Sequence, residues 1–315
     1  MKVGFLIYKW KFVNPKTDSA LRLIRQLIDS GVDVYIIYEH HLNYENSLCK
    51  GLRVNSKNYD DHYSFHANVY LQEEDLDLEE LKFIIYSNVP PLGNKMLRFL
   101  DELENPKIFN NVKGLDKVRF KNYVQELLPE NSTLLPLTHY AKHSDEIIQF
   151  IEAHREHHKW ILKPNVGYGG DNIMLLQTKK DYWQHDLKKY VSNSKGTIVL
   201  QEFLPGVSNG DTRILMLQGK PLGAMKRIPG EIHYLTNCHS GGRAIPHEIT
   251  DAELDICNQI GNQLKKDGLV FAGIDIIQDK LIEVNGLSPG GIGRINYLSN
   301  TALEIPIIEK ILNIA

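Results

Sequence analysis

Two carboxylates and an amide near the carboxyl end of the chain have the spacing of a metal site. Asp275 and Glu283 lie in two β-branched runs on either side of Gln278-Asp279-Lys280, a pattern that predicts a hairpin. If the pairing is centred on Asp279, Asp275 faces Glu283, and Asn285 lies two residues farther along the same face. Facing carboxylates repel unless something neutralises them, and oxygen ligands of this kind suit Mg²⁺ beside substrate phosphates.

The register of this hairpin decides whether the side chains meet. A two-residue turn would shift the pairing by one and place Asp275 opposite Ile282. The alternative is a solvated hairpin with one polar face, and the segment by itself favours neither interpretation.

A lysine and a group of glycines follow a predicted strand over 159–163. Lys163 ends the strand, and Gly167, Gly169 and Gly170 come after it. The segment lacks Gly-Lys-Ser/Thr and Gly-x-Gly-x-x-Gly, so it is neither a P-loop nor a Rossmann fingerprint. Backbone N–H groups of a glycine-rich hairpin can still approach phosphates closely, and Lys163 would add a positive charge. The alternative is an ordinary turn between two strands.

Other polar residues stand next to predicted strands, where surface charges are also common. Gln201 and Glu202 near the end of strand 197–203 could bring backbone amides to an adenine edge, or could simply join a strand to a polar loop. The loop 228–243 ends in Gly241-Gly242-Arg243, which suits a mobile lid over an anion. An exposed flexible loop would have the same composition.

Composition limits the classes of protein. The chain has 315 residues, 42% of them hydrophobic and 24% charged, with a net charge of −3, which is typical of a globular enzyme without a nucleic-acid footprint. No apolar run approaches the roughly 20 residues of a membrane helix, and the start lacks the features of a signal peptide. Three scattered cysteines, Cys49, Cys238 and Cys257, indicate a reducing cytoplasm.

Hydrophobic periodicity predicts the elements. Residues 2–38 read as a strand, a helix that Asp18 or Ser19 can cap, and a second strand, whereas 39–80 look polar and irregular, with an acidic loop and helix start over 73–80. Strands are predicted at 81–86, 107–110, 159–163, 172–177, 197–203, 213–217, 221–226 and on both sides of the hairpin turn, and helices at 96–104, 116–127, 147–157, 181–191, 250–267 and 305–314. The fold class is therefore an open α/β domain followed by α+β modules.

These features in this order resemble the ATP-grasp superfamily and, within it, the bacterial glutathione synthetase family. The resemblance rests on the lysine before the glycine-rich loop, Gln-Glu-Phe-Leu at a strand end, and Asp…Glu-x-Asn on a hairpin. It extends nearly end to end, through the stretches 14–20, 161–164, 209–213, 227–229, Asn237, 241–243 and 268–277.

The resemblance implies an ATP-grasp fold with an N-terminal α/β substrate domain at 1–115, an ATP lid at 116–203, and a C-terminal domain at 204–315 with a mobile loop at 228–243. It implies an ADP-forming ligase that joins γ-glutamyl-cysteine to glycine through an acyl phosphate. ATP and Mg²⁺, with two ions expected, would be the cofactors. The partners would be small molecules, with no nucleic acid or membrane, and the protein would be a cytoplasmic homo-oligomer.

The resemblance also implies roles for single residues. Those expected to contact ATP are Lys117, Lys163, Gly167, Gly169, Gly170, Gln201, Glu202, Leu204, Asp211 and Asn285. Asp275, Glu283 and Asn285 would bind the metal, and Arg213 and Arg227 would stabilise the acyl phosphate. The residues expected at the substrates are Asp18, Ser19, Asn237, Gly242, Arg243 and Ser288.

Three stretches depart from the family pattern, all on the side of the substrates. Ser87-Asn88-Val89 replaces a basic stretch, Leu235-Thr236 stands where an arginine is usual, and 286–291 differs after the metal asparagine. One alternative is therefore a ligase of the same build that acts on another amino acid, peptide or protein tail. A second alternative is a non-catalytic nucleotide-binding scaffold.

Overall fold

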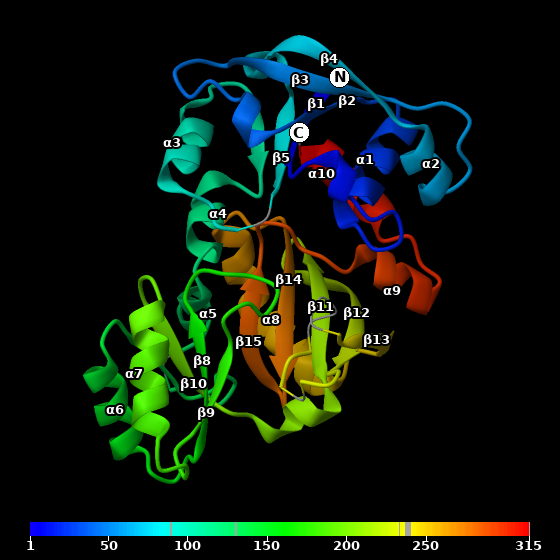
Figure 1. Cartoon of the computed structure of the whole chain (residues 1–315). Helices are drawn as coiled ribbons and strands as arrows, with labels where there is room; N and C mark the ends of the chain where they lie inside the picture. The colour runs from blue at the N-terminus through cyan, green and yellow to red at the C-terminus, as the bar shows by residue number, and fades with distance from the viewer. Residues whose placement is uncertain (89, 130, 233, 237–240, 315) are drawn as a thin grey trace.

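A six-stranded sheet forms the amino-terminal part of the molecule (Figure 1). In the computed structural model, which describes residues 1–88, 90–129, 131–232, 234–236 and 241–314, its order is β4-β3-β2-β1-β5-β6. Its strands are β1 (Lys2–Ile7), β2 (Asp33–Ile37), β3 (Leu48–Asn55), β4 (Tyr70–Asp77), β5 (Phe83–Ser87) and β6 (Lys107–Phe109). Strands β1, β2, β5 and β6 are parallel, whereas β3 and β4 are antiparallel additions.

Helices cover this sheet, two of them where the apolar periodicity predicts them and one within the segment 39–80. They are α1 (Ser19–Asp29), α2 (His62–Asn68) and α3 (Asn94–Glu102). Asp18 caps α1 as predicted, because its side chain accepts a hydrogen bond from the amide of Leu21. This cap fixes the point at which the chain leaves the sheet and enters the helix.

The prediction of an irregular segment over 39–80 is wrong. β3, α2 and β4 occupy it, and the acidic stretch belongs mainly to the edge strand β4. Within β4 only Leu76 is buried, so the strand lacks the apolar alternation by which strands are recognised. Charged side chains suit an edge strand, because they discourage pairing with other chains.

A four-stranded antiparallel sheet, in the order β7-β10-β8-β9, makes the smallest part of the molecule. Its strands are β7 (Thr138–Ala141), β8 (Lys159–Pro164), β9 (Met174–Gln177) and β10 (Ile198–Glu202). Helices α6 (Ser144–Ala153) and α7 (Trp183–Asn193) cover one face, and Trp160, Leu162 and Leu187 are buried between the two layers.

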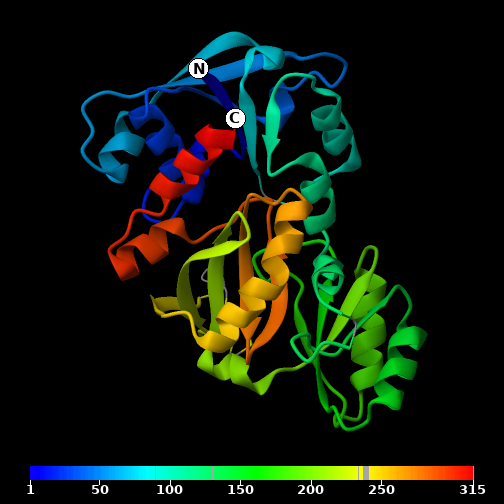
Figure 2. The ribbon, with the colours of Figure 1, turned by 180° about the vertical axis from the view of Figure 1, so that it is seen from behind.

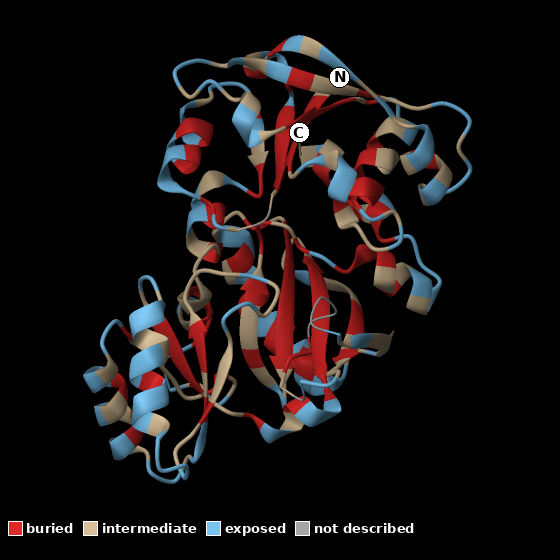
Figure 3. Ribbon diagram, viewed as in Figure 1, coloured by how far each residue is buried: buried red, intermediate tan, exposed pale blue. Residues whose placement is uncertain are grey.

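The third sheet lies between the other two (Figure 1) and has the order β13-β12-β11-β14-β15. Its strands are β11 (Asp211–Leu217), β12 (Lys220–Ile228), β13 (Arg243–Pro246), β14 (Phe271–Ile277) and β15 (Lys280–Asn285). Helix α8 (Asp251–Lys266) covers one face and begins with a capping box between Thr250 and Glu253. Figure 3 shows that β11 and β14 are buried along most of their length.

Two short helices join the first sheet to the second. The sequence predicts one helix over 116–127, but α4 (Val112–Val118) and α5 (Val124–Leu127) are separated by a 3₁₀ turn at Lys121–Tyr123. The interruption matters for the site, because it turns Lys121 toward the third sheet.

The carboxyl end of the chain returns to the first sheet. Helix α9 (Ile292–Ser299) leaves the third sheet, and α10 (Glu304–Ile314) packs against α1, as the view from behind also shows (Figure 2). Helix α10 thus packs on the amino-terminal part of the molecule although it lies at the carboxyl end of the chain. Within the described part of the chain, each helix is too short or too polar to span a lipid bilayer.

Candidate active site

The hairpin β14–β15 brings Asp275 opposite Glu283 as predicted, but by a different route. The turn has two residues, Gln278 and Asp279, both with positive φ. Such a turn alone would place Asp275 opposite Ile282. The register shifts between Asp275 and Ile276. Ile282 is therefore left without a partner, and the two carboxylates face each other.

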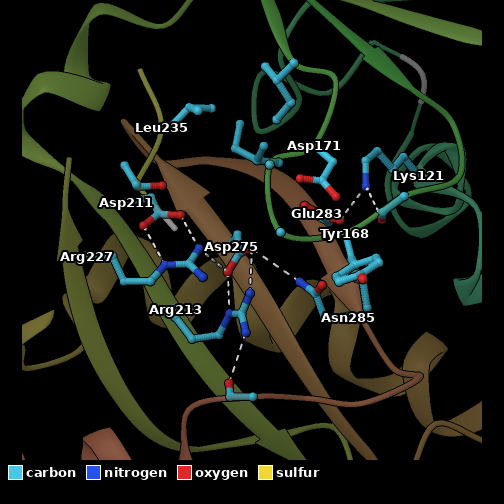
Figure 4. Close-up of a pocket in the computed structure, with 18 of the residues that line it drawn as sticks. Lys121, Tyr168, Asp171, Asp211, Arg213, Arg227, Leu235, Asp275, Glu283 and Asn285 are labelled. Atoms are coloured by element: carbon cyan, nitrogen blue, oxygen red, sulfur yellow. Dashed lines mark hydrogen bonds and ion pairs between the residues drawn. The ribbon is translucent and has the colours of Figure 1, made fainter. Parts of the chain in front are cut away.

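A cleft of about 850 Å³ lies beside this hairpin and is lined by residues of the second and third sheets and by loops and the start of α1 next to the first sheet. Figure 4 shows the charged side chains at its centre. The predicted residues that line it are Asp18, Ser19, Lys163, Gly167, Gly169, Gly170, Gln201, Glu202, Leu204, Asp211, Arg213, Arg227, Asp275, Glu283, Asn285 and Ser288. Residues far apart in the sequence thus meet around one space.

Four predicted residues are not in this group. Asn237 lies outside the described residues. Lys117 forms ion pairs with Glu126 and Asp267, both at 3.0 Å, and does not line the cleft. The prediction that it contacts ATP is not supported, because the last turn of α4 directs it toward the end of α8. Gly242 and Arg243 are also absent from the lining, since Arg243 begins the edge strand β13 and is exposed.

Asp275 is the centre of a buried network of charges (Figure 4). Its carboxylate accepts hydrogen bonds from Arg213, with Nη2 at 2.8 Å, and from the Asn285 amide at 3.2 Å. Arg227 Nη2 lies 2.9 Å from the same carboxylate. Burial alone would raise the pKa of Asp275, but the two guanidinium groups outweigh it and hold the pKa well below its ordinary value.

Arg227 also binds a second carboxylate, that of Asp211, with Nε 2.8 Å from Oδ1. Burial would lower the pKa of Arg227, but Asp275 and Asp211 raise it above its ordinary value. Arg227 therefore keeps its charge, and both Arg213 and Arg227 are held by carboxylates. Each lines the cleft, so each can stabilise negative charge while its position is held by the acids.

Glu283 is neutralised by a residue that the sequence did not reveal. Lys121 Nζ lies 2.8 Å from Glu283 Oε1 and 3.0 Å from the carbonyl oxygen of Gly167 (Figure 4). Burial would raise the pKa of Glu283, but Lys121 lowers it below its ordinary value. Lys121 lies in no motif, and only the 3₁₀ turn brings it here. The predicted repulsion from Asp275 still raises the pKa of Glu283, but it is outweighed because each carboxylate has its own cation.

Lys163 is fully buried at the end of β8 and donates a hydrogen bond to Gln201 Oε1 at 3.0 Å. Burial lowers its pKa to about 8, Lys121 adds to the shift, and Glu283 opposes it. Lys163 and Lys121 therefore place two positive charges on one side of the cleft, where the glycine-rich loop crosses it.

The glycine-rich loop between β8 and β9 has a conformation that requires glycine. Gly169 and Gly170 have φ values of +68° and +86°. Tyr168, which is half exposed, and Asp171 also line the cleft and were not predicted (Figure 4). Neither stands out in the sequence, because tyrosine and aspartate are common in turns.

Apolar side chains line another part of the cleft, from β8, the end of β10 and β15. They include Ile161, Phe203, Leu204 and Ile282. Glu202 connects the end of β10 to the segment just before β7. Its amide donates a hydrogen bond to the Leu137 carbonyl at 2.8 Å, and its Oε1 accepts one from the Leu137 amide at 3.0 Å. A flat apolar slot beside strand ends is suited to a purine ring.

The residues of the hairpin fit a hard divalent cation. The described part of the chain contains no group of three or more His, Cys, Asp or Glu side chains that could hold a metal. Asp275, Glu283 and Asn285 nevertheless offer oxygen donors on one face of the hairpin, next to the space for a nucleotide. Mg²⁺ is usually held by one or two carboxylates together with substrate phosphates, so these residues would suffice.

The opposite end of the cleft is built from loops and helix starts. Asp18 caps α1 and also accepts a hydrogen bond from the hydroxyl of Tyr8. Ser87 at the end of β5 and Ser288 in the segment after the hairpin are joined through their hydroxyl oxygens at 3.1 Å. Ser288 and Ser87 thus connect this end of the cleft to two of the stretches that depart from the family pattern.

A glycine-rich loop from a small antiparallel sheet that faces an acidic hairpin from a second sheet defines an ATP-grasp ligase. Solved structures with this fold include D-cycloserine synthetase DcsG (10% identity, TM-score 0.66, 98% of this chain and 99% of that chain). They also include D-alanine–D-alanine ligase from Bacillus anthracis (13% identity, TM-score 0.61, 98% and 96%). The predicted fold class is confirmed.

The family follows from the sequence comparisons. Residues 1–115 match the prokaryotic glutathione synthetase N-terminal domain, and residues 126–300 match the ATP-grasp domain of the same enzymes. Glutathione synthetase of Agrobacterium fabrum is 32% identical over 75% of this chain and 71% of its own length, and that of Prochlorococcus marinus is 28% identical over 100% of both. The chain belongs to the prokaryotic glutathione synthetase family, and the predicted ADP-forming ATP-grasp ligase is confirmed.

Proposed function

We propose that the protein joins γ-glutamyl-cysteine to glycine and converts ATP to ADP and phosphate. The observation that carries this proposal is the union, in one cleft, of Lys121, Lys163 and the glycine-rich loop with the hairpin pair Asp275 and Glu283. The family membership of both the N-terminal and the ATP-grasp part supports the choice of substrates.

The reaction needs two steps in which atoms balance. A carboxylate oxygen of the dipeptide attacks the γ-phosphorus of ATP, ADP leaves, and an acyl phosphate forms. The glycine amine then attacks the acyl carbon, loses a proton, and expels phosphate as the amide bond forms. Both steps concentrate negative charge on phosphoryl oxygens, so preorganised cations accelerate them.

The charges of the cleft have separate tasks in this scheme. Lys121 and Lys163 would attract the ATP phosphates, and the amides of the loop at Gly169 and Gly170 would cover them. Arg213 and Arg227, fixed by Asp275 and Asp211, would stabilise the charge of the acyl phosphate. Asp275, Glu283 and Asn285 would hold Mg²⁺, which supplies charge neutralisation at the phosphates, and we propose that two ions bind.

The adenine ring would occupy the apolar slot beside Leu204, with Glu202 at its edge. Asp18, Ser19 and Ser288 would bind substrate, and described loop residues Leu235 and Thr236, which are buried and near the cleft, would cover it. We also propose that the enzyme is cytoplasmic and forms a homo-oligomer.

The test supplies the purified protein with Mg-ATP, γ-glutamyl-cysteine and glycine and measures the tripeptide by mass together with ADP. One tripeptide for each ADP is the expected result. ADP release only with a different carboxylate and amine would favour the ligase of other specificity, to which the departures at 87–89 and 286–291 point. ATP binding without ADP release on any pair would support a scaffold instead.

A further inference from the structure

One cation of the cleft is without a partner among the residues that the structure describes. Arg294, in the first turn of α9, lines the cleft, and within the described residues it makes no hydrogen bond or ion pair. The other cations of the lining are all engaged, namely Arg119 with Asp116, Lys121 with Glu283, Lys163 with Gln201, Arg213 with Asp275, and Arg227 with Asp211. A half-buried guanidinium without a partner is suited to an anionic ligand.

Helix α9 packs against α1, so Arg294 in its first turn lies at the end of the cleft that the starts of these two helices form. The amide of Ile292 donates to Ser19 Oγ at 3.4 Å, so the starts of α9 and α1 are in contact. The Arg22 guanidinium from α1 lies against Gly293, where a Cβ would come within 2.7 Å of its Cζ. Asp18, the cap of α1, lines the same space, which gives this end one acid and one free cation.

We propose that Arg294 binds the α-carboxylate of the γ-glutamyl group and that Asp18 binds its α-ammonium group, an inference that rests on the proposed function. This head of the dipeptide is a zwitterion, and it takes no part in the bond that forms. The reacting carboxylate lies at the opposite end of the dipeptide and must reach the phosphates beside the hairpin. A site for the head must therefore lie at the far end of the cleft and carry both charges.

The pairing explains why this arginine has no internal partner. A planar guanidinium can accept a carboxylate through two parallel hydrogen bonds, which fixes the orientation of the substrate as well as its charge. A substrate with an apolar or neutral group in place of the zwitterion would leave the charge of Arg294 without a partner and that of Asp18 without a cation in the cleft. The two residues thus select for γ-glutamyl substrates against simple acyl-cysteines.

The first test compares Arg294→Met with Arg98→Met, a control at an exposed arginine on α3. We expect the KM for γ-glutamyl-cysteine to rise roughly 10- to 100-fold in Arg294→Met, as the loss of a charge-assisted pair predicts. The KM for ATP should be unchanged, and saturating dipeptide should restore most of kcat. Arg294→Lys should give an intermediate KM, because it keeps the charge and loses the fork.

The second test uses substrates that lack one half of the zwitterion. 4-Aminobutyryl-cysteine lacks the α-carboxylate, so the wild-type enzyme should bind it poorly. The Arg294→Met substitution should not weaken its binding further. Glutaryl-cysteine keeps a carboxylate and lacks the ammonium group, so its KM should still rise in Arg294→Met. This crossed pattern is not expected from a general disturbance of α9.

Three results would overturn the assignment. A rise in the KM for glycine with an unchanged KM for the dipeptide would assign Arg294 to the acceptor. Equal kinetics in Arg294→Met and Arg98→Met would show that Arg294 is only solvated. A KM for 4-aminobutyryl-cysteine that rises in Arg294→Met as much as that for the natural dipeptide would exclude the carboxylate contact. If the wild-type enzyme makes no tripeptide, the proposed function itself fails, and the control assay shows this first.

Discussion

The two ends of the cleft are held in different ways. At the nucleotide end, acids and cations on neighbouring strands and turns are paired before any ligand binds, as for Asp275 with Arg213 and Arg227, and Glu283 with Lys121. At the substrate end, the lining comes from loops and helix starts and includes Ser288, whose hydroxyl group contacts that of the buried Ser87, and Arg294, which has no partner among the described residues.

This difference separates positioning from recognition. Paired charges on regular strands keep their geometry in the empty protein, so little reorganisation is needed when phosphates bind. A cation without a partner is instead available to a ligand that brings the complementary charge. We therefore expect substitutions at the nucleotide end to affect turnover strongly, and those at the substrate end to affect the KM for the dipeptide.

Glu283→Gln should cause the largest loss. It removes a proposed metal ligand and the partner of Lys121, so we expect kcat to fall more than about 100-fold, which is a barrier change of about 2.7 kcal/mol. The free energy of unfolding of the protein without ligands should fall by about 1 kcal/mol, because a half-buried lysine loses its ion pair. Steady-state kinetics and thermal unfolding measure the two effects.

Glu309→Gln is the matched control, since Glu309 is exposed on α10. Both its activity and its stability should equal those of the parent. Turnover of Glu283→Gln within about tenfold of the parent, or about 1.4 kcal/mol, would show that the hairpin does not carry the metal. A rise in stability would show that repulsion from Asp275 outweighs the ion pair with Lys121.

Lys163 gives the nucleotide end a pH dependence. Its pKa of about 8 means that the folded protein loses this charge above pH 8, whereas an unfolded chain keeps it until a pH of about 10.4. Between these values the unfolded state binds more protons, so this residue makes the free energy of unfolding rise with pH. Affinity for ATP should change in the opposite direction and fall by up to about tenfold per pH unit above 8.

Titration calorimetry with a non-hydrolysable ATP analogue and Mg²⁺ measures the nucleotide affinity at each pH without interference from the thiol or amine of the substrates. Lys163→Arg serves as the control, because arginine stays charged throughout the range. An affinity in the wild-type protein that is constant from about pH 7 to about pH 9 would mean that Lys163 does not contribute its charge to phosphate binding.

Gly293→Ala tests how the substrate end is held. Its Cβ would meet the Arg22 guanidinium, which donates hydrogen bonds to the carbonyl oxygens of Pro15 (3.2 Å), Lys16 (3.3 Å) and Asp18 (3.4 Å). Moving Arg22 disturbs all three bonds, so we expect unfolding to become easier by about 1–3 kcal/mol and the KM for the dipeptide to rise. Gly93→Ala, where a Cβ meets nothing within 4 Å, is the control for thermal unfolding and kinetics.

Equal behaviour of the two alanine variants would show that Arg22 adapts freely. A loss of kcat with an unchanged KM for the dipeptide would show that the substrate end contributes to turnover and not to substrate binding. Either result would remove the distinction between the two ends.

The nucleotide end could be predicted from the sequence because its residues lie on strands whose alternation fixes which side chains share a face. The shared face of Glu283 and Asn285 follows from this rule, whereas the facing of Asp275 and Glu283 depended on a register that the sequence left open and that a bulge provides. The edge strand β4 was missed because its exposed faces carry no apolar pattern. Short-range periodicity reports burial, so strands that are mostly solvated escape it.

The rest of the site depends on contacts between distant elements. Lys121 reaches Glu283 only because a 3₁₀ turn interrupts the predicted helix, and Lys117, which was predicted to contact ATP, pairs with Asp267 instead. Arg294 enters the cleft only because α9 packs against the start of α1. No local pattern contains this information, since it arises from tertiary packing.

The smallest effect is expected for Ser87→Ala at the substrate end. Ser87 is buried, and its hydroxyl group bonds to Ser288, so its removal leaves one hydroxyl without that partner. We expect the free energy of unfolding to fall by about 1 kcal/mol and the KM for the dipeptide to change less than about threefold, or 0.7 kcal/mol. Ser192→Ala on the exposed side of α7 controls for the loss of a hydroxyl group.

If Ser87→Ala raised the KM for the dipeptide as strongly as Arg294→Met while stability stayed constant, the hydroxyl pair would bind the substrate directly. Recognition at this end would then rest on neutral hydrogen bonds, and the contrast between a charge-paired nucleotide end and an open, cationic substrate end would no longer hold.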